Sequence, residues 1–394
     1  MRGRAAALAA CALALVLTPG ATARAERATP TQVWRLKAMH TQFSLALPAS
    51  AAARAPTLEA KLARQLEAIV ARVEHVANEW RPGTPLAQVN AGAGGWVRAP
   101  AELRALLRLS LAVARQSDGA FDPSWAALRG LWRFPPRGGS AAAVASSRAG
   151  VAVPGASSED GGGAARQVPD AALCRQRAAF VDHRAIDIDD AQGRVRLRRV
   201  GMALGLGGVA KGWTLDRLRE RLEAAGLRAY ALDAGGQLLV RGGLGTAQPY
   251  RVGVRDPRAE DPEAALALLE VQDGSVSTSA DYERFFEVGA VRYHHLLDPR
   301  DGQPARALRS ATVVVALQEP NAAARADALS TAIFVAGPQR GADLCASLAP
   351  AGGCVLVDAA GALHVSPALR PRLHAGPNLV LHLLPVRGGP GASP

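Results

Sequence analysis

Apolar residues recur three or four positions apart in several stretches of the chain, and this spacing places them on one face of a helix. Long helices are predicted over 57–80, 100–117 and 321–335, and over a stretch that ends at Ala225. A shorter helix is predicted from Thr84 to Asn90, because Pro85 suits the first turn of a helix. The residues expected to face the core of the first two long helices are Leu58, Leu62, Leu66, Ile69, Val70, Val73, Val76, Leu103, Leu106, Leu107 and Leu111.

Strands are predicted where short apolar runs end at Gly, Pro, Asn or Asp. An opening pair of strands covers 34–47, and a buried strand covers 310–317. Shorter strands are expected within these ranges of the chain: 184–197, 229–241, 250–271, 274–297 and 378–386. Together the elements predict an α+β fold, in which mixed sheets are flanked by helices.

A glycine-dense stretch, residues 204–213, lies between a strand-like run and a helix-like run at the middle of the chain. It contains Lys211, one of only three lysines, whereas arginine supplies nearly all the other positive charge. Two interpretations fit this pattern. The backbone N–H groups of the loop bind an anion, or the stretch is a tight strand-to-helix turn with a solvated lysine.

Two known phosphate-binding motifs can be compared with this stretch. Gly205-x-Gly207-x-x-Ala210 imitates a dinucleotide fingerprint, but the acidic residue downstream, Asp233, lies 28 positions from Gly205 rather than about 20. A P-loop needs Gly before the lysine and Ser or Thr after it, and here Ala and Gly212 hold those places. A P-loop is therefore excluded, while a dinucleotide-dependent oxidoreductase remains a minor alternative.

The N-terminus has the pattern of a signal peptide over residues 1–25. Arg2 and Arg4 precede an apolar run that is too short to span a bilayer, and Ala23-Arg24-Ala25 has the form of a cleavage site. We therefore expect export to the periplasm. Lipid anchoring at Cys11 is less favoured, because the apolar run before this cysteine is short.

The exported chain is expected to form one domain over 34–386, preceded by a linker over 26–33. A segment rich in Gly, Ala and Ser, 136–170, lacks the apolar residues needed to pack and is predicted to be a disordered insertion. The tail, 387–394, is also predicted to be disordered.

The formal net charge of +12 raises the question of a nucleic-acid partner. The arginines are scattered through the predicted helices and strands, with no block of five or six like charges. Aromatic residues do not alternate with them as stacking platforms. We therefore predict no nucleic-acid partner and expect the charge to attract small anionic ligands.

Three cysteines remain after cleavage, so at most one bridge forms within the chain. Cys345 and Cys354 are close in sequence, and an oxidising compartment would permit a bond between them. The third is Cys174. Because there is no C-x-x-C and no Cys/His cluster, a zinc site is not predicted.

Two groups of residues have chemistry of their own. Asp327 and Thr331 lie four positions apart on one predicted helix, so their oxygens project from the same face and together suit a hard cation. Taken alone, an ordinary polar helix face with Asp327 beside Arg325 is the plainer interpretation. His295, in His294-His295-Leu296-Leu297-Asp298-Pro299, suits a general base near neutral pH, and a strand-end histidine is the plainer interpretation.

Six motifs occur in an order that resembles the ApbE family, the FAD:protein FMN transferases of bacterial periplasms. The resemblance covers about residues 39–337, and Asn90 fits it as well. The motifs are Gly119-Ala120-Phe121-Asp122, Leu206-Gly207-Gly208-Val209-Ala210-Lys211-Gly212, Asp233-Ala234-Gly235-Gly236, Ser277-Thr278-Ser279-Ala280-Asp281-Tyr282, His295-Leu296-Leu297-Asp298-Pro299 and Asp327-Ala328-Leu329-Ser330-Thr331-Ala332.

The resemblance implies a reaction in which FAD is the substrate. Its FMN half moves through a phosphoester bond to a Thr or Ser hydroxyl of an exported or membrane-bound redox protein, and AMP leaves. Mg²⁺ is required. The resemblance also implies an ApbE-like fold with two lobes and a nucleotide cleft between them.

The family's functional residues can be carried over by their place in the motifs. Asp327, Thr331 and a backbone oxygen near Gly208 would hold the metal. His295 would activate the acceptor hydroxyl, and Lys211 would meet the phosphate charge of FAD during catalysis. The other residues expected to contact the flavin nucleotide are Met39, Gly119, Ala120, Phe121 and Leu297.

The chain departs from the family pattern at several motif positions. Gly205 stands where the family usually has an aspartate that contacts FAD, and His40 replaces the Gly of a Met-Gly-Thr motif. Ala280 and Asp301 replace a Gly and a Thr in two further motifs. A non-catalytic FAD-binding protein and an FAD hydrolase that yields FMN and AMP are therefore kept as alternatives.

Overall fold

The computed structural model describes residues 31–53, 58–134, 168–243, 248–376 and 379–385. The predicted signal peptide and tail, and the predicted insertion up to residue 167, lie outside the described residues. The last residue of the predicted insertion, Asp170, is described. Its side chain accepts hydrogen bonds from two backbone N–H groups and caps α5 (Ala171–Ala178). The sequence pattern did not predict this helix, which lacks an apolar face.

A nine-stranded mixed sheet forms the centre of the fold, in the order β1-β2-β6-β7-β10-β13-β14-β15-β17. Its pairs are antiparallel except for the last, β15 with β17. Because β1 begins at Thr31, the predicted linker 26–33 is too long by three residues. The strands are β1 (Thr31–Ala38), β2 (Thr41–Leu47), β6 (Tyr230–Ala234), β7 (Leu238–Arg241), β10 (Gly274–Ala280), β13 (Leu308–Ala316), β14 (Gly353–Asp358), β15 (Leu363–Val365) and β17 (Leu381–Leu383).

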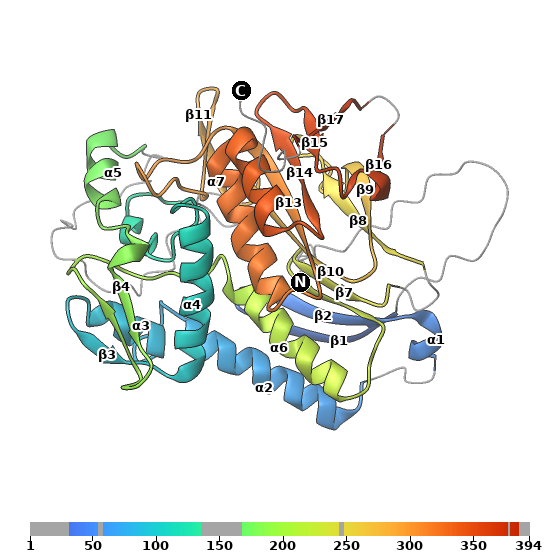
Figure 1. Cartoon of the computed structure of the whole chain (residues 1–394), viewed down its shortest axis with the longest axis horizontal. Helices are drawn as coiled ribbons and strands as arrows, with labels where there is room; N and C mark the ends of the chain where they lie inside the picture. The colour runs from blue at the N-terminus through green and yellow to red at the C-terminus, as the bar shows by residue number, and fades with distance from the viewer. Residues whose placement is uncertain (1–30, 54–57, 135–167, 244–247, 377–378, 386–394) are drawn as a thin grey trace, which may run out of the picture.

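Helices cover one face of this sheet. In Figure 1, α6 (Ala210–Ala224) and α7 (Ala322–Leu348) lie side by side, and α2 (Ala60–Ala77) follows next to α6. Five of the inward residues predicted for α2 are confirmed as buried, and Ile69 is only half-buried against the same core. The five are Leu62, Leu66, Val70, Val73 and Val76. Helix α7 packs directly on β10 and β13 at the centre of the sheet.

The prediction of a long helix over 321–335 is half confirmed. Gly337 has φ 80° and ψ 180°, outside the helical region, but the chain then continues as a second helical segment to Leu348. Pro338 is tolerated there because it opens the new segment, where no earlier carbonyl requires its missing N–H. The second segment is joined to β14 by a disulfide between Cys345 and Cys354.

The opposite face of the nine-stranded sheet packs on a small antiparallel sheet in the order β16-β9-β8. These strands are β8 (Tyr250–Arg255), β9 (Ala265–Val271) and β16 (Leu373–Ala375), preceded by the 3₁₀ turn η4 (Arg370–Arg372). Valines and leucines of both sheets form the apolar layer between them. The sheet is therefore covered by helices on one side and by strands on the other.

A third sheet, in the order β3-β5-β4, lies with α3 and α4 beside the central sheet (Figure 1). A two-stranded hairpin, β11-β12, carries the predicted histidine motif at its end. The described residues include no helix that is long and apolar enough to cross a membrane. The remaining elements are α1 (Ala49–Ala52), α3 (Pro85–Ala91), β3 (Trp96–Arg98), α4 (Ala101–Gln116), η1 (Ala126–Leu128), η3 (His183–Ala185), β4 (Ile186–Asp189), β5 (Arg194–Leu197), β11 (Phe285–Val288) and β12 (Val291–His294).

Candidate functional site

The start of α6 and the middle of α7 meet at Asp327. One carboxylate oxygen of Asp327 lies 3.3 Å from Lys211 Nζ, and the other accepts a hydrogen bond of 3.1 Å from the Gly212 N–H. Asp327 is only 4% exposed, whereas the Lys211 side chain is 31% exposed. The structure thus joins two distant predicted residues at a helix N-terminus, where partial positive charge favours anions.

Thr331 lies one helical turn beyond Asp327 and faces β10. Its hydroxyl is 3.1 Å from Ser279 Oγ, and Ser279 Oγ is 2.9 Å from Ser330 Oγ. A methyl group added at Gly208 would lie 3.7 Å from Thr331 Oγ1, so the backbone of Gly208 approaches the same hydroxyl. The three predicted metal-binding residues are therefore neighbours.

These neighbours offer only oxygen atoms, which are the ligands that Mg²⁺ prefers. The donors are one carboxylate, one threonine hydroxyl and the backbone at Gly208. Within the described ranges, no three His, Cys, Asp or Glu side chains gather in a group that could hold a metal by themselves. A cation here would need further oxygens, which a substrate phosphate or water can supply.

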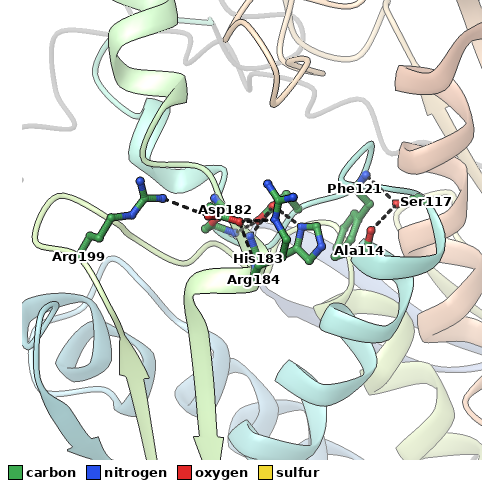
Figure 2. Close-up of polar contacts among 9 residues, drawn as sticks. Ala114, Ser117, Phe121, Asp182, His183, Arg184 and Arg199 are labelled. Atoms are coloured by element: carbon green, nitrogen blue, oxygen red, sulfur yellow. Dashed lines mark hydrogen bonds and ion pairs between the residues drawn. The ribbon is translucent and has the colours of Figure 1, made fainter.

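The Gly119-Ala120-Phe121 segment leaves α4 and reaches the same place. Gly119 has φ 78°, a conformation that glycine adopts without strain, and this turn directs Phe121 inward. The Phe121 N–H donates to Ser117 Oγ (Figure 2), and its ring would lie 3.3 Å from a methyl group at Gly208. The prediction that this segment lies near the glycine-rich turn is thus consistent with the geometry.

A hydrogen-bonded pair, Asp122 and His183, holds the residues that follow this segment. Asp122 accepts hydrogen bonds from the backbone N–H of His183 at 2.8 Å and from His183 Nδ1 at 3.0 Å. Its other oxygen accepts from the N–H and the hydroxyl of Ser124. Figure 2 shows the imidazole of His183, from η3, beside Phe121.

Met39 and Leu297, two predicted flavin contacts, have different surroundings. Met39 has φ 49° at the turn between β1 and β2. Its sulfur lies 3.7 Å from Thr214 Oγ1 in the second turn of α6. Leu297 packs against Trp132 and Phe286, an aromatic cluster at the β11-β12 hairpin. The structure brings Met39 to α6 but gives Leu297 mainly a packing role in the contacts described.

His295 follows β12 and is held by a hydrogen bond from its N–H to the carbonyl of Arg284. Its Nδ1 is buried and has no hydrogen-bond partner among the described residues. The pKa of His295 is lowered to about 3, chiefly by burial and then by the charges of His294, Arg284 and Lys211. His295 is therefore neutral at physiological pH and lies within the electrostatic reach of Lys211.

Gly205 has no space for a side chain. A methyl group there would lie 2.7 Å from Trp125 Nε1 and 2.9 Å from an Arg129 nitrogen. The backbone is also fixed, because the Gly205 N–H donates to the Pro123 carbonyl and Trp125 Nε1 donates to the Gly205 carbonyl. The indole of Trp125 thus fills the space that a side chain at position 205 would need.

Several residues at this site were missed by sequence reasoning. The hydroxyls of Ser279 and Ser330 form a cluster with that of Thr331. The carboxylate of Asp216 accepts hydrogen bonds from the backbone N–H groups at the start of α7. Burial raises the pKa of Asp216 to about 6. Only its place among the inward leucines of α6 signalled a buried carboxylate. Two surface hollows, of about 510 and 460 Å³, lie elsewhere, so the predicted cleft stays a prediction.

Comparison with known proteins gives a consistent result. Residues 39–355 match the model of the ApbE family. The chain is 35% identical over 312 residues to the FAD:protein FMN transferase of Treponema pallidum, which covers 77% of this chain and 76% of that protein. It is also 30% identical to the FAD:protein FMN transferase of Rhodobacter capsulatus, over 75% of this chain and 50% of that protein.

Solved structures agree with the family match. The crystal structure of the ApbE protein from Thermotoga maritima superposes with a TM-score of 0.69 at 26% identity, covering 87% of this chain and 99% of that one. The apo form of the flavinyl transferase ApbE from Pseudomonas stutzeri gives a TM-score of 0.67 at 25% identity, covering 89% and 98%. The predicted α+β, ApbE-like fold is thereby confirmed.

Proposed function

The chain belongs to the ApbE family, and from this we propose that it transfers the FMN half of FAD to a Thr or Ser hydroxyl of a target protein. FMN transfer is the activity named for its relatives in Treponema pallidum and Rhodobacter capsulatus. AMP is the leaving group, because the pyrophosphate of FAD is split between its two phosphates. The observation that carries the proposal is the Asp327 centre, where a lysine, a helix N-terminus and a threonine hydroxyl converge.

Charge explains how this centre would receive FAD. The pyrophosphate carries negative charge, and Lys211 and the N-terminus of α6 present positive charge next to Asp327. The ring of Phe121 lies close to Gly208 and would offer an apolar surface next to the centre. Lys211 would exchange part of its contact with Asp327 for a contact with phosphate.

A magnesium ion fits the oxygen donors of Asp327, Thr331 and the Gly208 backbone. When bound, Mg²⁺ supplies charge neutralisation at the phosphate oxygens, which lowers the barrier to breaking the pyrophosphate. Asp327 already contacts Lys211 and the Gly212 N–H, so its carboxylate is held in place for this role.

His295 is proposed to accept the proton of the acceptor hydroxyl. The hydroxyl oxygen forms a bond to the FMN phosphorus, the bond to the bridging oxygen breaks, and AMP leaves with that electron pair. The neutral imidazole has a free lone pair that can take this proton. Binding of the anionic pyrophosphate near Lys211 raises the pKa of His295 and makes it a better base.

The test is a transfer assay with FAD, Mg²⁺ and a flavin-acceptor domain. We expect the acceptor to gain the mass of FMN and an equal amount of AMP to appear, both requiring Mg²⁺. Asp327→Asn should abolish the transfer. Free FMN and AMP without modified acceptor would instead identify an FAD hydrolase, and bound but unchanged FAD would identify a non-catalytic binding protein.

We further propose that the protein acts in the periplasm on an exported or membrane-bound redox protein. The predicted signal peptide, residues 1–25, and the disulfide between Cys345 and Cys354 support this location, because disulfides persist in oxidising compartments. Fractionation of cells that produce the full chain tests it. A protein that keeps its N-terminus and stays in the cytoplasm would contradict the proposal.

A further inference from the structure

The turn at residues 205–208 is fixed from its far side by groups that the proposed function does not use. Gly205 is held through both backbone atoms, by Pro123 and by the indole of Trp125. Asn90 holds the residue before it, with hydrogen bonds to both the N–H and the carbonyl of Leu204. Four polar contacts over two consecutive residues leave this turn little freedom to move.

An ion pair lies directly behind the turn. Arg129 contacts the carboxylate of Glu79, whose side chain is only 8% exposed. The backbone of Leu206 lies near the same carboxylate and counters the rise in its pKa. Glu79 therefore joins the end of α2 to the residue that precedes the two glycines of the turn.

Aromatic rings keep the guanidinium of Arg129 in place. Its central carbon lies 4.3 Å from the ring centroid of Trp80 and 5.4 Å from that of Trp125. Trp125 thus contacts both the pair and the turn, because its nitrogen donates to the Gly205 carbonyl at 2.9 Å. Such contacts hold a planar cation in one orientation.

Stability alone is a weak reason for this arrangement. Burial raises the pKa of Glu79 and lowers the pKa of Arg129, so taking the two charges out of water has a cost. An apolar pair of similar volume is often as stable as a buried ion pair, whereas a charged pair fixes geometry more strictly. The turn that the pair contacts leads within two residues to Gly208, which lies against Thr331 and Phe121.

We propose that Glu79, Arg129 and Trp125 are positioning residues that set the distance between the Gly208 backbone and Thr331. The proposal rests on the proposed function, since that distance matters only if both groups hold a cation together with FAD. None of the three residues needs to touch the substrate. Their effect passes through Leu206 and Gly205, the two residues that they contact directly.

The experiment measures FAD binding to the whole chain by calorimetry across a series of MgCl₂ concentrations, together with thermal melting. In Glu79→Gln the neutral amide keeps the shape but loses the charge. We expect the MgCl₂ concentration for half-maximal FAD binding to rise about tenfold, as is typical when a group behind a metal ligand is removed. In Trp125→Phe, which loses only the indole N–H, we expect a rise of about threefold by the same reasoning.

A matched control is Glu270→Gln, which removes the ion pair with Arg251 on the small sheet far from this turn. This variant should keep the magnesium requirement of the wild type. A general loss of stability would lower the melting temperature without changing magnesium dependence in the folded protein. The proposal would be overturned if Glu79→Gln and Trp125→Phe both had the same magnesium dependence as the wild type.

The transfer assay separates this proposal from the proposed function. If the wild type binds FAD with magnesium but modifies no acceptor, the proposed function fails while the binding series still decides the role of Glu79. If the wild type transfers FMN and Glu79→Gln does so with an unchanged magnesium requirement, only the positioning proposal fails. A wild type that binds no FAD overturns both.

Discussion

Replacing Gly212 by alanine is the sharpest test of how α6 and α7 hold the site together. The added methyl group would lie 2.6 Å from Ala324 Cα and closer still to the Ala323 carbonyl, whereas ordinary contact begins at 3.4 Å. The helices would have to separate by about 0.8 Å even for the first of these contacts. The carbonyl cannot turn away freely, because Gln237 donates a hydrogen bond of 2.8 Å to it.

We expect Gly212→Ala to lose about 3 kcal/mol of unfolding free energy, the upper part of the range for overpacked cores. Because α6 carries Lys211 and α7 carries Asp327, the same shift should lower FMN transfer about a hundredfold, as a 1 Å misplacement does. Thermal melting and the AMP-release rate, measured below the melting temperature, give the two quantities.

The matched control is Gly207→Ala in the same motif, where a methyl group meets nothing within 4 Å. This variant should keep the stability and activity of the wild type. If Gly212→Ala melted and reacted like Gly207→Ala, the close approach of α6 and α7 would be wrong, and so would the explanation of the Asp327 centre.

Three further outcomes are expected. Thr331→Val should leave the protein folded but raise its magnesium requirement about tenfold in FAD-binding calorimetry; an unchanged requirement would remove Thr331 from the metal site. Gly205→Asp should lower the melting temperature by several degrees, because the new carboxylate meets Trp125; a stable variant that binds FAD more tightly would refute this. His295 has a pKa of about 3 in the folded protein against an ordinary histidine pKa of 6.5, so the unfolded chain binds more protons between these pH values. Without FAD, stability should therefore fall as the pH is lowered through this window, and His295→Gln should flatten the decline in urea titrations at each pH.

The sequence predicted those features that depend on local spacing. The recurrence of Leu62, Leu66 and Val70 identified the buried face of α2, and the interval between Asp327 and Thr331 placed both side chains on one helix face. Both inferences rest on the helical repeat alone. The family motifs added the fold, which the comparisons confirm.

Contacts between distant segments could not be predicted in this way. Ser279 meets Thr331 across 52 positions, and Gly205 meets Trp125 across 80, so no periodicity links either pair. The second segment of α7 was missed because Gly337-Pro338 normally ends a helix, and α5 was missed because it has no apolar face. The indole next to Gly205 could not be predicted either, since only the fold brings Trp125 there.

The position of Trp125 gives this protein a built-in optical reporter. Its indole donates to the Gly205 carbonyl, and only six tryptophans are present in the whole chain. Flavins absorb in the region where tryptophan emits, so arrival of FAD near this turn should quench the intrinsic fluorescence by energy transfer. A stopped-flow record of that quenching would follow how fast the nucleotide enters and leaves, without attaching any dye to the protein.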